Sequence, residues 1–473
     1  MAAPCVRAQI TYLGFPLTIP LCRIYRNFKF YNYLSDNETY DVCLVGDGSG
    51  GKGAAVSAAR DGAKTLLIEA PLSLGGTSTW AGVNNYEPAA GATGLPQELY
   101  ERLAEHPYAE SIQRRTASYH PDRPWGIYDR SDHTDYRLTL NRRCGTALTF
   151  EPKTTSDATI DSVKEAGVEL RPSTRFIQVQ TSDKRVQSID IQGNDFDGRI
   201  QAGVFIDSTA DIYLARAAGR ESAIGVESRN AYDEPIAPEQ PESVLNNASL
   251  CYRIAPLPPE ESLQIDLPPD GIDLDELRPV TSIRTYANGD RNMNPLHLMT
   301  GQEAFELGYR AYEESEKRIK AHWHPLQTRY GFERWKMTWV SPMLGIRDTH
   351  RLAGEHVLTE HDVETPLEQT ENKEVVTFAN HGLDFHDSRS SRQLVNGPYG
   401  IHFRCLLPRE YGNLLVACRG ASLSSIGAST CRLSRTMIVL GQAVGTTAAL
   451  WGDDVKAHDA SRLRETFKAG GSE

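Results

Sequence analysis

A short apolar run that ends in a cluster of glycines constrains this chain more than any other feature. Residues 40–45 (YDVCLV) predict a buried strand, and residues 46–51 then follow the pattern G-x-G-x-x-G. Residues 51–62 predict a helix of small side chains, and residues 64–69 (KTLLIE) predict a second buried strand. A strand, a helix and a strand within about 30 residues form a βαβ unit with parallel strands. We therefore expect a parallel sheet that is covered by helices.

The residues of this turn have separate expected tasks. The first glycine makes the tight turn, the second lets the backbone approach a pyrophosphate, and the third lets the helix pack closely on the strand. The helix N-terminus offers unpaired N–H groups and a partial positive charge to phosphates. The acid that ends the second strand would accept hydrogen bonds from ribose hydroxyls. The predicted dinucleotide-binding residues are Gly46, Gly48, Ser49, Gly50, Gly51 and Glu69.

Asp47 does not suit this turn, because it places a carboxylate in a loop that would hold phosphate. We expect it to weaken binding unless its side chain points away or pairs with Lys52.

A second segment rich in glycine and hydroxyl groups decides between NAD and FAD, which share the first fingerprint. Residues 75–82 (GGTSTWAG) begin about six positions after Glu69. Such a segment is typical of the chain that runs along a ribityl group and the edge of a flavin. The sequence therefore predicts FAD, with Gly75, Gly76 and Thr77 among its contacts.

From this point the chain resembles the FAD-dependent oxidoreductase family of the glutathione-reductase-like FAD/NAD(P)-binding superfamily. The likeness also covers four later segments, namely residues 204–211 (VFIDSTAD), 347–363 (RDTHRLAGEHVLTEHDV), 413–419 (NLLVACR) and 441–449 (GQAVGTTAA). It implies a noncovalent FAD cofactor and adds Ala70, Phe176 and Thr209 to the expected cofactor contacts. Ser208, Ala210 and the serines of residues 422–425, where relatives often carry a histidine, depart from the family pattern.

The last strong helical pattern, residues 433–450, would direct its N-terminus at the flavin. Ser429 or Thr430 is expected to cap this helix, and Ser429 is therefore included among the cofactor contacts. Gly441 and Gly445 would let the helix lie close to the first βαβ unit.

The expected fold class is α/β, with a discontinuous Rossmann-like FAD/NAD(P)-binding domain and an inserted α+β substrate domain. The FAD-binding domain is assigned to residues 40–90, 155–220 and 403–455, and the substrate or cap domain to residues 91–154 and 221–402. Residues 1–39 form an N-terminal extension and residues 456–473 a C-terminal tail. Within the inserted domain, the many prolines between residues 235 and 279 predict loops and edge strands, and residues 302–323 predict one helix.

A flavin dehydrogenase or oxidase needs a base to take the proton that accompanies the hydride. His402 is the first candidate for this base, and Arg404 is the candidate anchor for an anionic substrate, because both precede the flavin-side strand. His381 and His386 are second choices, and Arg142 with Arg143 could also bind a carboxylate.

No metal site is expected. His350, His356 and His361 interleave with acids, but their spacings of six and five residues do not share one helical face. Thr359 and Asp362 are better explained as a helix cap. The chain has no second G-x-G-x-x-G and no C-x-x-C pair, so electrons would enter from a small organic substrate and leave to oxygen, a quinone or another protein.

The composition and net charge limit which binding partners and which cellular compartment we expect. The net charge of −12 makes nucleic acid a poor default partner, and no run of 18 apolar residues predicts a membrane span. Eight scattered cysteines suggest reduced thiols in the cytoplasm. Two alternatives stay open: a flavin-dependent tRNA-modifying or RNA-binding protein, and an FAD-binding electron carrier without a substrate of its own. An NAD-only dehydrogenase is disfavoured by residues 75–82 and by the C-terminal segments.

Overall fold

The computed structural model describes most of the chain. The described residues are 7–12, 15–20, 38–86, 93–106, 110–113, 115–120, 123–129, 147–194, 196–272, 280–370, 374–387, 389, 396–452 and 454–469. They divide into two compact units, Met1–Asn37 and Glu38–Glu473. In the first unit β1 (Arg7–Tyr12) pairs with β2 (Phe15–Pro20) as an antiparallel hairpin. Arg142 and Arg143 lie outside the described residues.

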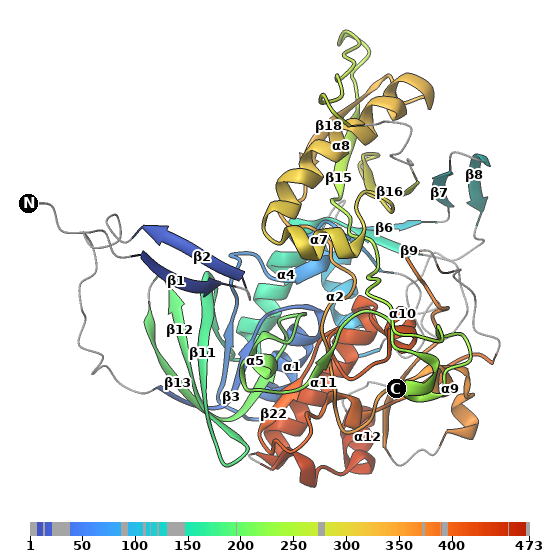
Figure 1. The fold of residues 1–473 in the computed structure, drawn as a ribbon. Coiled ribbons are helices and arrows are strands. Elements are labelled where there is room, and N and C mark those ends of the chain that lie inside the picture. Colours follow the sequence, from blue (N-terminus) through green and yellow to red (C-terminus); the bar gives the residue numbers. More distant parts are fainter. Residues whose placement is uncertain are drawn as a thin grey trace, which may run out of the picture. The chain divides into compact units, whose positions relative to one another are not determined.

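The larger unit is built on a seven-stranded sheet with the order β10-β4-β3-β13-β12-β11, in which β22 also pairs with β13 (Figure 1). Its parallel strands are β3 (Glu38–Val45), β4 (Thr65–Ile68), β10 (Glu169–Arg171), β13 (Asp197–Asp207) and β22 (Leu414–Val416). The antiparallel strands are β11 (Thr174–Ser182) and β12 (Arg185–Gly193). The predicted α/β class with a parallel sheet is confirmed.

Two helices that are far apart in the sequence pack against each other beside this sheet. They are α1 (Ser49–Arg60), which follows β3, and α11 (Ser434–Trp451). A Cβ added at Gly441 would lie 2.0 Å from the carbonyl oxygen of Gly50, and one at Gly445 would lie 2.1 Å from that of Ala54. The close approach predicted for these glycines is confirmed, because no larger residue fits between the two backbones.

A second, six-stranded sheet has the order β18-β15-β17-β16-β7-β8. Its strands are β7 (Arg115–His120), β8 (Arg123–Asp129), β15 (Tyr252–Pro256), β16 (Thr281–Thr285), β17 (Arg291–Pro295) and β18 (Trp335–Val340). Helix α8 (Arg310–Arg329) lies over this sheet in Figure 1, and its Trp323 belongs to the apolar cluster that the sheet residues Tyr252 and Ile283 share.

Two expectations for this region are wrong. The helix predicted over residues 302–323 is two helices, α7 (Gly301–Leu307) and α8, because the chain turns at Gly308 with φ +57°. Strand β15 is not an edge strand, since it pairs with both β17 and β18. It tolerates a proline because Pro256 is its last residue.

Short strands and helices complete the larger unit. The strands are β5 (Asn85–Tyr86), β6 (Glu110–Gln113), β9 (Ala147–Phe150), β14 (Ser222–Ala223), β19 (Arg351–Leu352), β20 (Val375–Ala379) and β21 (Tyr399–His402). The helices are α2 (Leu95–Ala104), α4 (Pro152–Glu165), α5 (Tyr213–Ala217), α6 (Arg229–Tyr232), α9 (Glu360–Glu364), α10 (Ser425–Cys431) and α12 (Ala460–Ala469), with 3₁₀ turns η2 (Gly76–Ser78), η3 (Leu367–Gln369), η4 (Phe403–Leu406) and η5 (Val455–Ala457).

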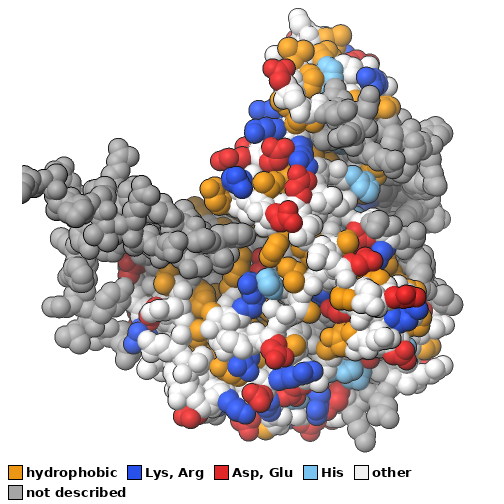
Figure 2. Space-filling view, viewed as in Figure 1, with side chains coloured by type: hydrophobic (Ala, Val, Ile, Leu, Met, Phe, Trp, Pro, Cys, Tyr) orange, Lys and Arg blue, Asp and Glu red, His pale blue; other side chains and the backbone are white. Residues whose placement is uncertain are grey.

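The surface and the thiols bear on partners and location. None of the helices in the described part of the chain is long and apolar enough to cross a membrane. Acidic and basic side chains are interspersed over the face drawn in Figure 2, which gives the RNA-binding alternative no support there. Cys43, Cys251, Cys405, Cys418 and Cys431 are buried and unpaired.

Candidate functional site

The turn between β3 and α1 is shaped by its glycines. Gly46 has φ +95°, and a Cβ there would lie 2.7 Å from the carbonyl oxygen of Ser208. A Cβ at Gly51 would lie 2.2 Å from the carbonyl oxygen of Gly46, and one at Gly50 only 1.8 Å from that of Ala417. Helix α1 begins at Ser49 without a side-chain cap, so its first N–H groups are left for a ligand.

Asp47 belongs to the turn, but its side chain points away from it into the protein interior. Its side chain is fully buried, and its Oδ2 accepts a hydrogen bond from the Gly75 N–H at 2.7 Å. Lys52 is buried close enough to interact with this carboxylate electrostatically. Burial raises the pKa of Asp47 and lowers that of Lys52. The carboxylate therefore points away from the phosphate position, which is one of the two conditions set by the sequence.

The second glycine segment lies directly against the first. Gly75 and Gly76 both have positive φ, 103° and 52°, and a Cβ on Gly76 would lie 3.1 Å from the Cα of Gly48. The hydrogen bond from the Gly75 N–H to Asp47 Oδ2 joins the two glycine segments on their buried side. Two sequence-predicted cofactor segments are thus brought together.

Glu69 follows β4 and faces the same turn, because its Oε2 accepts the hydrogen bond of the Asp47 N–H. Burial raises the pKa of Glu69 to about 7, and the backbone N–H groups of Asp47 and Ala70 oppose this shift. The carboxylate is therefore held at the tip of the βαβ unit, where the motif expects the ribose.

A cavity of about 550 Å³ opens from this turn. Gly48, Ser49, Gly50 and Thr77 line one part of it. Other parts are lined by charged and imidazole side chains from five segments of the chain, namely Arg284, Arg347, His381, Asp384, His386, Arg419, Arg432 and Arg435. Arg419 is paired with Asp211 and Arg432 with Asp384, so the five arginines exceed the acids beside them by three and the lining is basic.

Arg347, Arg432, Asp384 and His386 form a connected group in this lining. Arg347 donates from Nη1 to Ser249 Oγ at 3.0 Å, and burial lowers its pKa to about 10. Asp384 Oδ2 lies 3.1 Å from Arg432 Nη2 and 2.9 Å from His386 Nε2. Although burial opposes it, these two neighbours hold the pKa of Asp384 well below its usual range.

His386 is neutral at pH 7 in this arrangement. Burial and the charge of Arg347 lower the pKa of His386 to about 4, against the hydrogen bond to Asp384. Because the carboxylate accepts at Nε2, the ring carries its proton there and keeps a lone pair on Nδ1. The second-choice histidines of the sequence, His381 and His386, both line the cavity.

The first-choice catalytic residues, His402 and Arg404, do not line this cavity, and their catalytic roles stay predictions. His402 is at the end of β21 and packs its ring on His356, with 4.8 Å between ring centroids. Arg404 has half of its side chain exposed and lies 3.5 Å from Glu374. Neither side chain lines the cavity.

The capping prediction for Ser429 and Thr430 is also wrong. Both residues lie inside α10, whose cap is Ser424, while α11 begins at Ser434 without a side-chain cap. The hydroxyl of Ser429 is buried and donates to the Ile426 carbonyl at 2.7 Å. The role of Ser429 as a cofactor contact stays a prediction.

The three remaining predicted contacts lie on the sheet. Ala70 is exposed just after β4, and Phe176 on β11 is partly buried against the main core. The hydroxyl of Thr209 donates to Asp207 Oδ1 at 2.7 Å and accepts the N–H of Tyr213 at 2.8 Å. Their contacts with a cofactor also stay predictions.

Sequence reasoning missed Arg284, Arg347, Asp384 and Arg432. Arg347 opens a segment that had been noted for its family resemblance, so that resemblance was an available signal. The others come from segments without a motif.

Solved structures are similar to this chain at low sequence identity. The geranylgeranyl bacteriochlorophyll reductase-like protein of Thermoplasma acidophilum is 14% identical, with 92% of this chain and 84% of that chain covered and a TM-score of 0.50. The myxobacterial chondrochloren halogenase CndH is 12% identical, with 91% and 78% covered and a TM-score of 0.46. The flavin-dependent brominase Bmp2 is 10% identical, with 91% and 83% covered and a TM-score of 0.47. No curated protein matches the chain.

The family comparison covers nearly the whole of the larger unit. The model described as "FAD dependent oxidoreductase" matches residues 41–463, which include the dinucleotide turn, the basic cavity lining and α11. The resemblance stated from the sequence is therefore confirmed, as is FAD as the cofactor. The chain belongs to the FAD-dependent oxidoreductase family.

Proposed function

We propose that this protein oxidises a small organic anion by hydride transfer to noncovalently bound FAD. The single observation that carries the proposal is the basic lining of the cavity that opens from the dinucleotide turn. A positively charged, partly enclosed lining favours a negatively charged substrate.

The residues around the turn fit FAD. Gly48 and Gly50 line the cavity with backbone alone, and α1 begins there without a side-chain cap. The diphosphate would bind at the N-terminus of α1 and the ribose at Glu69, with these residues in the positions that they already occupy. When bound, the flavin supplies the hydride acceptor.

Arg347 is the proposed anchor for the substrate anion. Its guanidinium is buried, and Ser249 and Asn247 fix one of its nitrogens by accepting hydrogen bonds. A buried arginine held in one orientation can pair with a carboxylate in two parallel hydrogen bonds. Arg432 is already engaged by Asp384, so it positions that acid rather than the substrate.

His386 is the proposed proton acceptor for the substrate O–H or N–H. Asp384 orients its ring and leaves Nδ1 as the basic nitrogen. With a pKa of about 4 it is a weak base in the free protein, partly because Arg347 is charged. An anion bound to Arg347 would neutralise that charge and raise the basicity of His386 at the moment it is needed.

An anaerobic substrate screen tests the proposal on the purified holoenzyme. The panel pairs hydroxy acids and amino acids with the corresponding neutral alcohols and amines, and the readout is bleaching of the flavin band at about 450 nm. We expect anionic members to bleach the flavin. Bleaching by the neutral members alone would refute the proposed substrate class, and a flavin that no member reduces would favour the electron-carrier alternative.

Three variants separate the proposed roles. Arg347→Met should weaken binding of the active substrate by about 100-fold, because a buried charge-assisted pair is lost. His386→Gln should slow flavin reduction by about 100-fold or more with substrate binding retained. Arg404→Met is the matched control and should change neither, because Arg404 lies outside the cavity. The electron acceptor is identified by measuring how fast oxygen, a quinone or a protein acceptor reoxidises the reduced flavin.

A further inference from the structure

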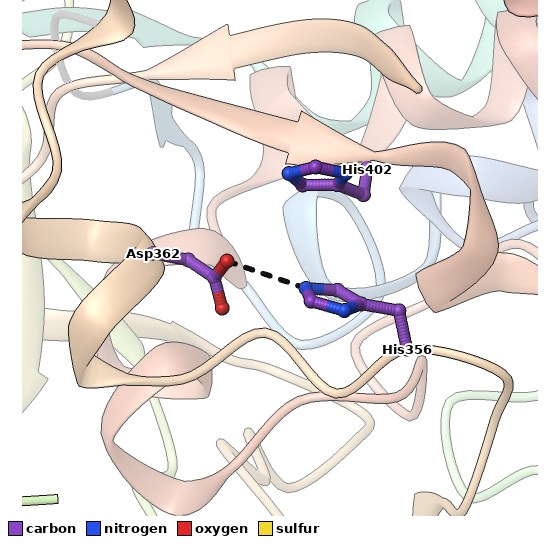
Figure 3. Close-up of side chains that lie close together, drawn as sticks. All are labelled: His356, Asp362 and His402. Atoms are coloured by element: carbon purple, nitrogen blue, oxygen red, sulfur yellow. Dashed lines mark hydrogen bonds and ion pairs between the residues drawn. The ribbon is translucent and has the colours of Figure 1, made fainter. Parts of the chain in front are cut away.

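A cluster of two histidines and one aspartate lies apart from the cavity. His356 stands in the loop before α9, Asp362 on α9, and His402 at the end of β21 (Figure 3). His356 Nε2 lies 3.3 Å from Asp362 Oδ1, and the two imidazole rings lie one above the other with 4.8 Å between centroids. One ligand-type atom from each residue lies within 4.8 Å of those of the other two.

We propose that His356, Asp362 and His402 form a binding site for one divalent first-row transition ion of the zinc type. Two imidazole nitrogens and one carboxylate oxygen are a donor set that suits Zn²⁺, with water in the remaining position. This proposal does not rest on the proposed reaction, because none of the three side chains lines the cavity.

The aspartate is held with one oxygen on the helix cap and the other toward His356. Asp362 is the third residue of a capping box, in which its Oδ2 accepts hydrogen bonds from the Thr359 N–H at 2.8 Å and the Thr359 hydroxyl at 3.1 Å. Its Oδ1 consequently faces His356. A carboxylate whose second oxygen is fixed by outer hydrogen bonds is the arrangement that orients metal ligands.

The histidines are held by separate backbone segments. His402 pairs with Val375 in the β20–β21 hairpin, and the His356 N–H donates to the Arg404 carbonyl at 3.3 Å. Ligand atoms around a tetrahedral Zn²⁺ lie about 3.3 Å apart. The ligand atoms, which lie within 4.8 Å of one another, are therefore within roughly 1.5 Å of that spacing.

Exposure and charge also suit an ion that arrives from solvent. The side chain of His356 is 35% exposed and that of Asp362 19%. The neighbouring charges on His402 are Asp362 and Glu374 on the negative side and Arg404 on the positive side.

The ion would join three segments of the chain, the loop before α9, α9 itself and β21. One of them, β21, is the partner of β20, and β20 leads into the cavity residues His381 to His386. A bound ion would thus stabilise the base of the hairpin that carries the proposed catalytic loop.

Zinc titration of the untagged, full-length holoenzyme tests the site. After chelator treatment and dialysis, calorimetry with ZnCl₂ should give one site per chain, and elemental analysis after gel filtration should find one zinc. His402→Gln and Asp362→Asn should weaken zinc binding by about 100-fold or more, because each removes a direct ligand. His361→Gln is the matched control, since this neighbouring histidine on α9 bonds to the Asp233 carbonyl instead.

The outcome does not depend on activity. Zinc should raise the Tm of the wild type and of His361→Gln and leave that of His402→Gln unchanged. Retained FAD and an unchanged metal-free Tm establish that a variant is folded, and if His402→Gln fails this check, Asp362→Asn decides. No saturable zinc uptake by the wild type, or uptake that survives both ligand variants, would overturn the proposal and leave a hydrogen-bonded His–Asp pair.

Discussion

The variant Gly441→Ala tests the close packing of α11 against α1. We expect it to destabilise the protein more than an ordinary small substitution in the core. The added Cβ would lie 2.0 Å from the carbonyl oxygen of Gly50, whereas Cβ atoms in proteins essentially never approach closer than 3.0 Å. Backbone faces backbone here, so no side chain can give way. The two helices must separate by about 1 Å, at a cost at the upper end of the usual range for overpacking, about 3 kcal/mol.

The strain should also weaken FAD binding, because Gly50 belongs to the dinucleotide turn, residues 46–51, as well. Loss of one charge-assisted hydrogen bond from this turn costs about 1.5–3 kcal/mol, which weakens FAD binding roughly 10- to 100-fold. For the unit Glu38–Glu473, an unfolding entropy of roughly 0.9 kcal/mol/K converts 3 kcal/mol into a fall in Tm of about 3 °C. FAD titration of the apoprotein and thermal unfolding measure the two effects.

Gly445→Ala is the matched variant. Its Cβ would meet the Ala54 carbonyl at 2.1 Å, one helical turn farther from the phosphate turn. We expect a similar fall in Tm with FAD affinity reduced much less. A Gly441→Ala variant with wild-type Tm, or equal losses of FAD affinity in the two variants, would refute the reasoning.

Two further predictions concern buried ionisable groups. Burial raises the pKa of Asp47 to about 8 and the charge of Lys52 opposes that rise, so Lys52→Met should raise this pKa further and destabilise the protein mainly above pH 8, where Asp47 ionises in the wild type, whereas the double variant Asp47→Asn/Lys52→Met should lose clearly less than the sum of the singles in urea unfolding at that pH; strict additivity would show that the two groups do not interact. His322 is buried between Tyr252 and Thr281, and burial lowers its pKa to about 3. Below pH 6.5 the unfolded chain takes up a proton that the folded chain refuses, so stability is full above pH 6.5 and falls by up to about 1.4 kcal/mol per pH unit toward pH 3. His322→Gln should flatten this acid limb and His324→Gln, at a partly exposed position on α8, should not; equal slopes in both variants would contradict the assignment.

The dinucleotide turn could be predicted because all its determinants lie within about 30 consecutive residues. Gly46, Gly51 and Glu69 are positioned by one strand, one helix and the next strand, so spacing along the sequence translates directly into space. The pairing of α1 with α11 could be predicted for a related reason. Gly441 and Gly445 are four residues apart, which places both on one face of a helix.

The catalytic side could not be predicted in this way. Arg284, Arg347, Asp384 and Arg432 come from four separate segments, and each alone resembles an ordinary solvated charge. Only the tertiary structure gathers them around one cavity. Apart from the family resemblance around Arg347 and the two histidines beside Asp384, nothing in their local sequence distinguishes them from charged residues that form surface pairs.

The distance of His402 from the cavity follows from the register of one hairpin. Strand β20 runs toward the cavity and ends at Ala379, which pairs with Tyr399 at the start of β21. Strand β21 then runs back, so His402 lies opposite Val375 at the other end of the hairpin. Nearness in sequence to β22 therefore does not place His402 in the cavity lining, while His381, just beyond Ala379, reaches it.

The direction of the Asp47 side chain could not be predicted from the sequence. The sequence indicated only that this carboxylate must point away from the phosphate or pair with Lys52. A carboxylate in a phosphate turn is unfavourable only if it faces the phosphate, and the direction of one side chain depends on what lies beneath the turn. Here the Gly75 N–H lies beneath it and donates to Asp47, while Lys52 supplies the opposing charge from the first turn of α1. The same contact fixes the second glycine segment against the first. The residue that looked unfavourable for FAD binding therefore helps to position the segment that we expect to follow the flavin.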